Sequence, residues 1–463
     1  GASRLAVELG NILENGQQSE ATAQFDFNRL YQKSKWLRQL DVESNKADQE
    51  RWRARITRYK DTVIKKNGKK VVKNRKRVDQ GAVPYVSKGL KFAGKLATSL
   101  KQASFSISEN AHTRLPGYTD STKYVGQNWK SMAPGVDFIL GRQPDTAWMN
   151  AAARKGLITK DTTFNSIFQQ NFDQRITFSA QLEPIRDLNI TLNLSKTFNK
   201  NYSETFRFID TSGGTNHSFK HLNPYAGGGF DVSYIAFKTL FGKFDPNRVS
   251  ATFKKFQDYR LILSERLGKA NPYSAGQPVG ADGYYYGYGK YAIDVLIPAF
   301  LAAYTGDDPN SVSLINQNNP NIKSNPFRGI KPKLNWKLDY NGLSKIKPLD
   351  KLFTNFSVSH GYTGNLSMNG FTSALLYQDV SQYGYPSFYD TISKNYVPYF
   401  LLPNISIGEQ FSPLIGIDMM FTNQLQAKFE YSKTRQLSLS LVDFQLSEVR
   451  STEFVIGAGW RKR

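Results

Sequence analysis

The chain has 463 residues, of which 40% are apolar, 13% aromatic and 21% charged, and its net charge is +23. It contains no cysteine, which excludes disulfides, iron–sulfur clusters and thiolate zinc sites. Its length allows two or three ordinary domains, or one large sheet or barrel. The positive charge favours an acidic partner, such as nucleic acid, anionic lipid or a lipopolysaccharide surface.

The N-terminal part combines one strand signal with a highly charged segment. We expect residues 1–41 to form a barrel strand and a turn, because residues 21–31 alternate weakly between apolar and polar. We expect residues 42–102 to form a charged periplasmic insertion, beginning with a helix over residues 42–61. The run IKKNGKKVVKNRKR (residues 64–77) holds eight basic residues and no acidic one. It is either a solvated loop or an anionic contact patch.

Residues 103–241 carry the clearest alternation and predict barrel strands with loops. In FDQRITFSAQLEP and the following NITLNLSKTF, every second residue is apolar and the residues between are polar. The short link EPIRDL (183–188) joins the two runs, which predicts one long antiparallel hairpin with a periplasmic turn. The longer excursions at 209–228 and 373–395 are then expected on the cell surface.

A helical insertion is predicted over residues 242–330, as a periplasmic cap. Residues 246–267 place apolar side chains at helical spacing, and residues 289–305 form an apolar stretch that ends before Gly306. The text DGYYYGYGKY (282–291) alternates tyrosine and glycine. It either packs a loop or offers a flexible aromatic surface that binds glycans or peptides.

Residues 331–463 again predict barrel strands, incomplete at the C-terminal end. The alternation in residues 352–370 is far longer than the usual strand of about 5–6 residues, whereas a strand that crosses a bilayer needs about 9–11. Between Leu441 and Val442 the apolar parity changes, which predicts a bulge.

The polar parity of these strands carries Ser, Thr, Asn, Gln and Gly with little charge. A barrel with a water-filled lumen needs this composition, whereas a soluble sheet exposes more Lys and Glu. The sequence therefore favours an all-β membrane protein, an antiparallel transmembrane barrel with helical periplasmic insertions, over a soluble β-protein; that the chain is part of a very large barrel is implied by a family resemblance. The residues expected to line the lumen are Ser179, Thr191, Asn193, Ser195, Asn355, Ser357, Ser359 and Thr363.

No catalytic constellation is present, so we do not expect an enzyme. The sequence has no G-x-S-x-G element, no phosphate-binding lysine loop and no H-E-x-x-H motif. His217 and His221 are close in sequence, but no carboxylate accompanies them at ligand spacing, so no metal site and no cofactor is predicted. No 18-residue apolar run exists for a transmembrane helix.

Several segments resemble the C-terminal part of the SprA/Sov family, the outer-membrane translocons of the type IX secretion system. In chain order they are GNILENGQ (10–17), PGVDFILGRQP (134–144), LEPIRDLNI (182–190), DVLIPAFLAAYTG (294–306), VSHGY (358–362), EQFSPLIGIDMMF (409–421) and VIGAGW (455–460). The family motif in the segment at residues 409–421 is structural rather than catalytic. Its residues here are Glu409, Gln410, Phe411, Ser412, Pro413 and Asp418.

The resemblance implies a location in the bacterial outer membrane and a wide pore with a lateral gate. It implies translocation of folded cargo proteins that bear a type IX C-terminal signal domain. The implied partners are a PorV-like shuttle barrel, a plug protein, a periplasmic peptidyl-prolyl isomerase and other type IX components, with outer-membrane lipid around the wall and no nucleic acid.

Two further expectations concern the wall and the alternative function. Because the chain is shorter than a full family member, the remainder of the barrel is expected from another chain or another part of the same gene product. The alternative function is a surface receptor or adhesin barrel that binds an external ligand through the loop at residues 282–291.

Overall fold

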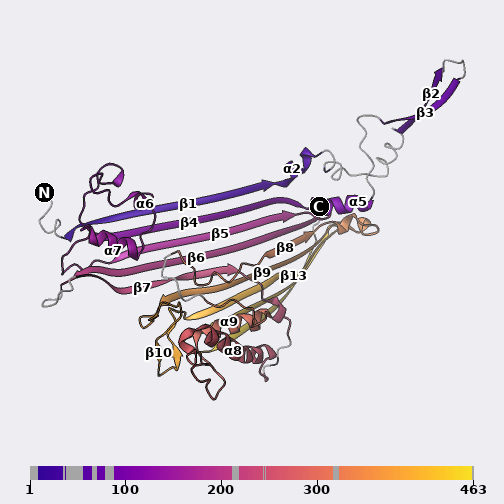
Figure 1. The fold of residues 1–463 in the computed structure, drawn as a ribbon. Helices are drawn as coiled ribbons and strands as arrows, with labels where there is room; N and C mark the ends of the chain where they lie inside the picture. The colour runs from indigo at the N-terminus through magenta and orange to yellow at the C-terminus, as the bar shows by residue number, and fades with distance from the viewer. Residues whose placement is uncertain are drawn as a thin grey trace.

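In the computed structural model, most strands form one antiparallel sheet, drawn in Figure 1. The order of the main path is β1-β4-β5-β6-β7-β9-β13-β14-β15, and β8 and β12 join it beside β6 and β9, which makes eleven strands within the described residues. Helices are few, so the expectation of an antiparallel all-β fold is confirmed. The structure describes residues 9–34, 37, 56–64, 70–78, 88–210, 218–242, 245, 247–315 and 323–460.

The nine strands of the main path are unusually long, at 15 to 22 residues each. Strands in globular sheets have a mode of about 5–6 residues. The sheet strands are β1 (Asn11–Asp26), β4 (Leu100–Tyr118), β5 (Phe168–Leu182), β6 (Leu188–Ile209), β7 (Ser218–Ser233), β8 (Asn335–Tyr340), β9 (Phe353–Ser373), β12 (Phe400–Leu401), β13 (Asn404–Phe421), β14 (Leu425–Ser440) and β15 (Leu446–Trp460). Two further pairs stand apart: β2 (Ile56–Ile64) with β3 (Lys70–Val78), and β10 (Tyr389–Asp390) with β11 (Asn395–Tyr396).

The two ends of the sheet differ in their connections. At one end, which we call the short-turn end, residues 183–187 join β5 to β6 and residues 422–424 join β13 to β14, while the longer connection of residues 27–99 joins β1 to β4. The helices α2 (Phe27–Lys33) and α5 (Lys88–Ala97) lie at this end, beside β1 and β4. At the other end, the long-loop end, residues 119–167 carry α6 (Val136–Ile139) and α7 (Thr146–Arg154), and residues 374–403 carry β10, β11 and β12. The short link of residues 441–445 between β14 and β15 also lies at the long-loop end.

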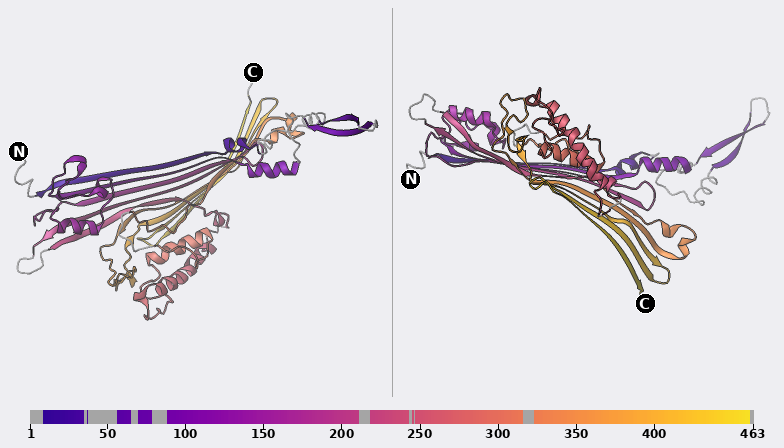
Figure 2. Two further views of the ribbon diagram at one scale, coloured as in Figure 1. Left: turned by 45° about the horizontal axis from the view of Figure 1, so that its top comes forward. Right: turned by 90° about the horizontal axis from the view of Figure 1, so that it is seen from below.

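Two strands that are distant in sequence, β7 and β8, occupy the same position in the strand order, between β6 and β9. β7 pairs with residues 365–372 of β9, and β8 pairs with residues 358–362 of the same strand. Both also pair with β6 on the other side. The chain thus leaves the sheet after Ser233 and returns at Asn335, further along the same position between β6 and β9. The intervening residues 234–334 form the helical insertion, which lies over one face of the twisted sheet in Figure 2.

The insertion is built around two helices, α8 (Ala251–Ala270) and α9 (Ile293–Thr305). The Ser250 side chain caps α8 by accepting a hydrogen bond from the backbone N–H of Phe253. Almost every residue of α9 is buried, and Gly306 ends the helix in the left-handed conformation at φ 71°. Both helices confirm the predicted helical segments. Their buried side chains form one core with Phe230, Leu366 and Ile407 of the sheet.

Gly364 of β9 makes the exit of the chain from the sheet possible. The backbone N–H of Tyr234 donates to the carbonyl of Gly364 at 2.9 Å. A Cβ atom on Gly364 would lie 2.1 Å from the carbonyl oxygen of Tyr234, well inside any tolerated contact. The first residue of the insertion therefore crosses β9 at a position where that strand presents no side chain.

The insertion does not lie at the predicted end of the sheet. It was expected as a periplasmic cap, on the same side as the turn EPIRDL. Instead, the backbone N–H of Tyr396, at the long-loop end, donates to the carbonyl of Gly287 at 2.8 Å, and the Tyr286 ring stacks on Tyr389 at 4.3 Å. The link between β5 and β6 lies at the opposite end. The insertion and the turn EPIRDL therefore cannot both face the periplasm. The insertion also extends beyond its predicted bounds of 242–330.

Four local predictions are wrong for the residues that the structure describes. Residues 218–228, expected in a surface excursion, lie in β7, and residues 27–31, expected in a strand, lie in α2. Residues 56–61 begin β2 rather than ending a helix, and the earlier part of that predicted helix, residues 42–55, lies outside the described residues. Leu441 and Val442 lie in the turn between β14 and β15, where the N–H of Ser440 donates to the carbonyl of Gln445 at 2.8 Å. The parity change there marks the end of a strand and not a bulge.

We predict that Gly364→Ala loosens the insertion, because the new methyl group forces the Tyr234 carbonyl away from β9. Overpacking of this kind typically costs about 1–3 kcal/mol. The rate of limited proteolysis within residues 234–334 should rise. Gly459→Ala is the matched control, because a Cβ there meets no atom within 4 Å. Equal proteolysis of the two variants would contradict the role of Gly364.

Candidate functional site: the two faces of the sheet

The face of the sheet that carries the insertion is covered only over its long-loop half. Its other half is uncovered and apolar across the sheet, and we call it the apolar belt. Most side chains of the belt are partly exposed, those on the edge strand β15 most of all, with Ile456 at 80% and Trp460 at 67%, while Ala180 is buried. Cross-strand pairing places the following residues on this one face: Ala21, Ala23 and Phe25; Ala103, Phe105 and Ile107; Ile176, Phe178, Ala180 and Leu182; Leu188, Ile190, Leu192 and Leu194; Leu338 and Tyr340; Phe356 and Val358; Ile415, Ile417 and Met419; Leu425, Ala427, Phe429 and Tyr431; Phe454, Ile456, Ala458 and Trp460.

The belt runs obliquely to the strands. On β5 the belt begins at Ile176. The residues that pair with it in turn across β6, β7, β9, β13 and β14 lead to Glu448 on β15. The belt on β15 instead begins at Phe454, six residues further along. At about 3.3 Å per residue and about 4.8 Å per strand spacing, six residues over six spacings correspond to an angle of about 35°. The belt is thus tilted relative to the strand direction.

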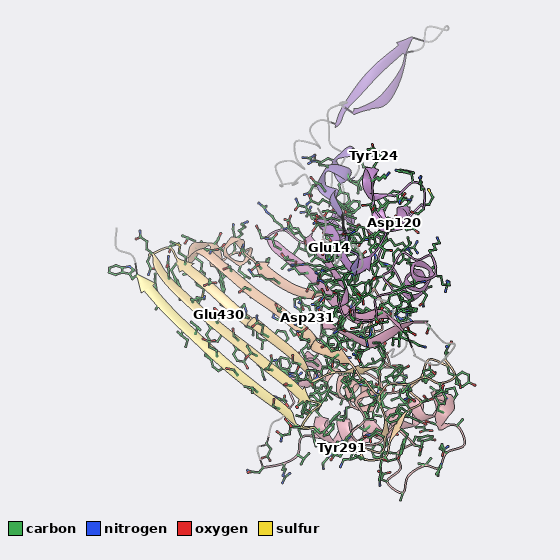
Figure 3. The ribbon with its side chains drawn as sticks, turned by 90° about the vertical axis from the view of Figure 1, so that its left-hand side faces the viewer. Glu14, Asp120, Tyr124, Asp231, Tyr291 and Glu430 are labelled. Carbon is green, nitrogen blue, oxygen red and sulfur yellow. The ribbon has the colours of Figure 1, made fainter. Side chains whose placement is uncertain are left out.

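The opposite face, which we call the polar face, is made of small uncharged side chains along nearly its whole length. Ser, Thr, Asn, Gln and Gly dominate it on β4, β5, β6, β9 and β14. Some of the charged residues on it are paired, as in Lys337 with Asp339 at 3.3 Å and Lys428 with Glu430 at 2.9 Å. Figure 3 labels Glu430 and Asp231 on the sheet. Charged side chains are thus a minority on this face, and part of them are neutralised in pairs.

The eight residues predicted to line a lumen all lie on the polar face. Ser179 pairs in register with Asn193, and its hydroxyl lies 2.9 Å from that of Ser104. A shallow hollow of about 240 Å³ brings Ser179, Asn193 and Ser195 together with Asn335. On β9 the register through β8 joins Ser359 to the same face. By the same pairing and alternation the face includes Thr191, Asn355, Ser357 and Thr363.

The residues of the family-like motif on β13 divide between the two faces. Gln410 and Asp418 are exposed on the polar face, in register with Thr363 and Ser357 of β9. Glu409 and Phe411 are 3% exposed and lie under the insertion. Between these parts, Ser412 and Pro413 belong to a bulge that adds two residues to β13 relative to both neighbouring strands, and the peptide bond between them is cis.

A buried arginine anchors the first segment of the insertion. Arg435 of β14 forms an ion pair with Glu409, and both side chains are fully buried. Its Nη2 donates to the carbonyl of Ala236 at 3.0 Å, and its Nη1 donates to the Thr239 hydroxyl at 2.9 Å. The hydroxyl of Tyr362 donates to Oε2 of Glu409 at 2.9 Å. Strands β9, β13 and β14 thus bind the segment through one connected network.

A second arginine extends this network to β15. The Nη1 of Arg450 donates to the carbonyls of Gly242 at 2.9 Å and Leu240 at 3.2 Å, and its Nε donates to Glu448 at 2.7 Å. We call Arg435 and Arg450 the arginine clamp. Sequence reasoning missed both residues. The signal was a charged residue at the apolar-face parity of β14, two positions before Leu437.

The tyrosine-rich loop is packed rather than open. Tyr288 is 2% exposed and its hydroxyl accepts a hydrogen bond from Asn271 at 3.0 Å, and burial raises its pKa above the ordinary value. Tyr286 stacks on Tyr389, as described above. Tyr291 is 46% exposed and is labelled at the insertion in Figure 3. The aromatic surface expected for ligand binding is thus mostly used in internal packing.

The described histidines show no metal-binding geometry. The Nδ1 of His221 lies 2.9 Å from Oε2 of Glu204, and its Nε2 lies 3.3 Å from Asn150 of α7, while His217 lies outside the described residues. Among the residues that the structure covers, no three His, Asp or Glu side chains are grouped to hold a metal ion. In the same residues, no helix is long and apolar enough to cross a membrane.

We predict that Arg435→Met releases the first segment of the insertion, because it leaves Glu409 buried without its cation. Breaking a buried ion pair on one side costs about 3–5 kcal/mol. Proteolysis within residues 234–242 and the free energy of unfolding both report the loss. Lys428→Met is the control on the same strand, since its pair with Glu430 is exposed and worth at most about 1 kcal/mol. A loss in Arg435→Met no larger than in the control would contradict the clamp.

Comparisons with known proteins add no family to this description. No model of a known protein family matches the chain, and no curated protein matches it. What the chain can do must therefore be argued from the two faces of the sheet and from the residues that hold the insertion.

Proposed function

We propose that the sheet is part of the wall of a β-barrel in the bacterial outer membrane. The apolar belt contacts lipid, and the polar face lines a water-filled lumen. The observation that carries the proposal is the belt itself, an exposed and tilted apolar band opposite a face of small uncharged polar groups. A soluble protein rarely exposes so large a continuous apolar surface.

The tilt of the belt agrees with a bilayer. Four alternate residues on one strand, as from Ile176 to Leu182, span about 20 Å, which at a tilt of about 35° covers about 16 Å of the apolar band of about 25 Å on outer-membrane barrels. Strands of such barrels tilt by about 35–45°, so that a band level with the membrane must cross the strands obliquely. Aromatic side chains gather at its short-turn rim, where the Phe353 ring lies 4.6 Å from that of Phe421. Aromatic girdles occupy this position in membrane barrels.

Both edges of the sheet support a wall that continues into other protein. Among the described strands, β1 pairs only with β4, and β15 pairs only with β14. An open edge cannot face lipid, because its backbone groups would be unpaired.

Beside β1, the loop of residues 119–141 exposes large apolar side chains, including Tyr124 and Val125, each at 78%. The amide of Asn15 ties this loop to β1 by donating to the carbonyl of Phe138 at 2.7 Å.

Conduction of proteins is the part of the proposal that rests on the resemblance to the SprA/Sov translocons. The polar face is compatible with it, because small uncharged groups offer few strong contacts to a passing protein. Short turns usually face the periplasm in outer-membrane barrels. The short-turn end is then periplasmic, and the insertion lies at the cell-surface end, against the lipid-side face of the wall. This placement replaces the periplasmic cap expected from the sequence.

Cysteine labelling tests the orientation of the two faces, since the natural chain contains no cysteine. We predict that Asn193→Cys and Ser357→Cys react with a membrane-impermeant maleimide in intact outer membranes. Leu192→Cys and Val358→Cys, their neighbours on the other parity, should be protected by lipid. Equal reaction at both parities would contradict the membrane orientation.

The same variants test protein conduction separately from the membrane orientation of the sheet. If cargo passes along the polar face, a bulky maleimide attached at Asn193→Cys should slow secretion, whereas attachment at an exposed site outside the sheet, such as Asn310→Cys, should not. Efficient labelling without any effect on secretion would leave the wall in place and contradict protein conduction.

A further inference from the structure

A row of lysines lies where the apolar belt meets the insertion. We call Lys196, Lys238, Lys333 and Lys433 the lysine collar. Lys196 of β6 pairs with Ile176, the first belt residue of β5. Lys433 of β14 lies two residues beyond Tyr431, the last belt residue of that strand. Lys333 and Lys238 come from the two ends of the insertion, between β6 and β14 along the same boundary.

Aromatic rings hold three of these ammonium groups at the boundary. The Nζ atom of Lys333 lies 4.7 Å from the ring centre of Tyr234, and that of Lys433 lies 4.8 Å from Phe241. Lys196 lies 5.8 Å from the ring of Phe230. Cation–π contacts of this kind keep the charge in place, while the apolar stem of each lysine lies along apolar surface.

The collar keeps most of its positive charge. Asp307 lies 3.9 Å from Nζ of Lys238 and 3.5 Å from Nζ of Lys333, so one carboxylate is shared by two lysines. The other nearby carboxylate, Glu448, is bound by the arginine clamp. Among the described residues, Asp307 is thus the one carboxylate that forms an ion pair with these four lysines.

We propose that the lysine collar binds the phosphate groups of anionic lipids in the leaflet at the long-loop end. This inference rests on the proposed function, because it requires the belt to lie in lipid. Headgroup phosphates lie just outside the acyl region, and basic side chains at that level bind them. The exposed ring of Phe241, at 51%, places an apolar surface beside the same cations.

The arrangement of the collar favours a row of lipid headgroups over one free phosphate ion. Lys196 and Lys433 lie on strands four spacings apart, which is at least about 19 Å. No single phosphate can contact both. The cations follow the edge of the belt instead of converging on one point, as a series of lipids along the wall requires.

The test uses the membrane assembly that contains this chain, reconstituted in nanodiscs of phosphatidylcholine with and without phosphatidylglycerol. Native mass spectrometry counts the anionic lipids that remain bound. In the double variant Lys333→Gln and Lys433→Gln, affinity for phosphatidylglycerol should fall about five-fold for each lysine removed, the effect of losing one cation near an anionic surface. Lys333→Arg with Lys433→Arg should retain binding.

The control is the double variant Lys337→Gln and Lys428→Gln, which removes the same charge from the polar face. It should bind phosphatidylglycerol as the natural protein does. An equal loss in the control would overturn the collar, as would unchanged binding in the collar variant or displacement of the lipid by millimolar inorganic phosphate. Maleimide protection of Leu192→Cys in the same nanodiscs separates the two proposals. If Leu192→Cys is not protected, both the membrane wall and the lysine collar are contradicted. If it is protected, the lipid-binding result tests the collar alone.

Discussion

The whole arrangement depends on the alternation of side chains in a β-strand, kept in register across the sheet. A slip of one residue would exchange the two faces of a strand. Within the belt the main irregularity is the bulge at Ser412 and Pro413, and it adds two residues, so the parity of β13 is preserved. One-residue shifts, such as that at Gly370, occur nearer the strand ends. The two faces therefore stay coherent across all nine strands of the main path.

The insertion does not disturb the register of the sheet, because the chain leaves and re-enters the sheet at the same position between β6 and β9. Backbone hydrogen bonds of β6 and β9 that β7 no longer satisfies are satisfied by β8. The inserted domain can therefore be large without opening the sheet. Gly364 allows the chain to cross β9, and the arginine clamp fixes its first segment by binding three main-chain carbonyls. The insertion, together with α7 over β4, β5 and β6, then buries the long-loop half of the apolar face and leaves the other half as the belt.

Local patterns were sufficient for most long strands of the sheet, the two faces and both helices of the insertion, but not for β2 or the first part of β7. The alternation in residues 176–194 indicates directly which residues share a face, and Gly306 marks the end of α9. Local patterns could not show which apolar residues are covered. Val358 and Leu366 lie on the same parity of β9, yet only Leu366 is fully buried, because the cover comes from residues far away in sequence.

The candidate site shows the same limit. Glu409 stood out in a motif, but its partners Arg435 and Tyr362 lie on other strands, and Thr239 is 196 residues from Arg435. Such contacts depend on the topology and leave no local signature. The end of the sheet at which the insertion packs was not predictable for a related reason, since its helical pattern carries no information about it.

The most direct test is a cryo-electron microscopy map of the intact assembly extracted from the outer membrane. We expect the detergent or lipid belt to contact Ile176, Leu192 and Ile456, the polar face to border water, and further strands to pair with both β1 and β15. Detergent against Asn193 and Ser357, or β1 paired with β15 so that this chain closes alone, would contradict the account.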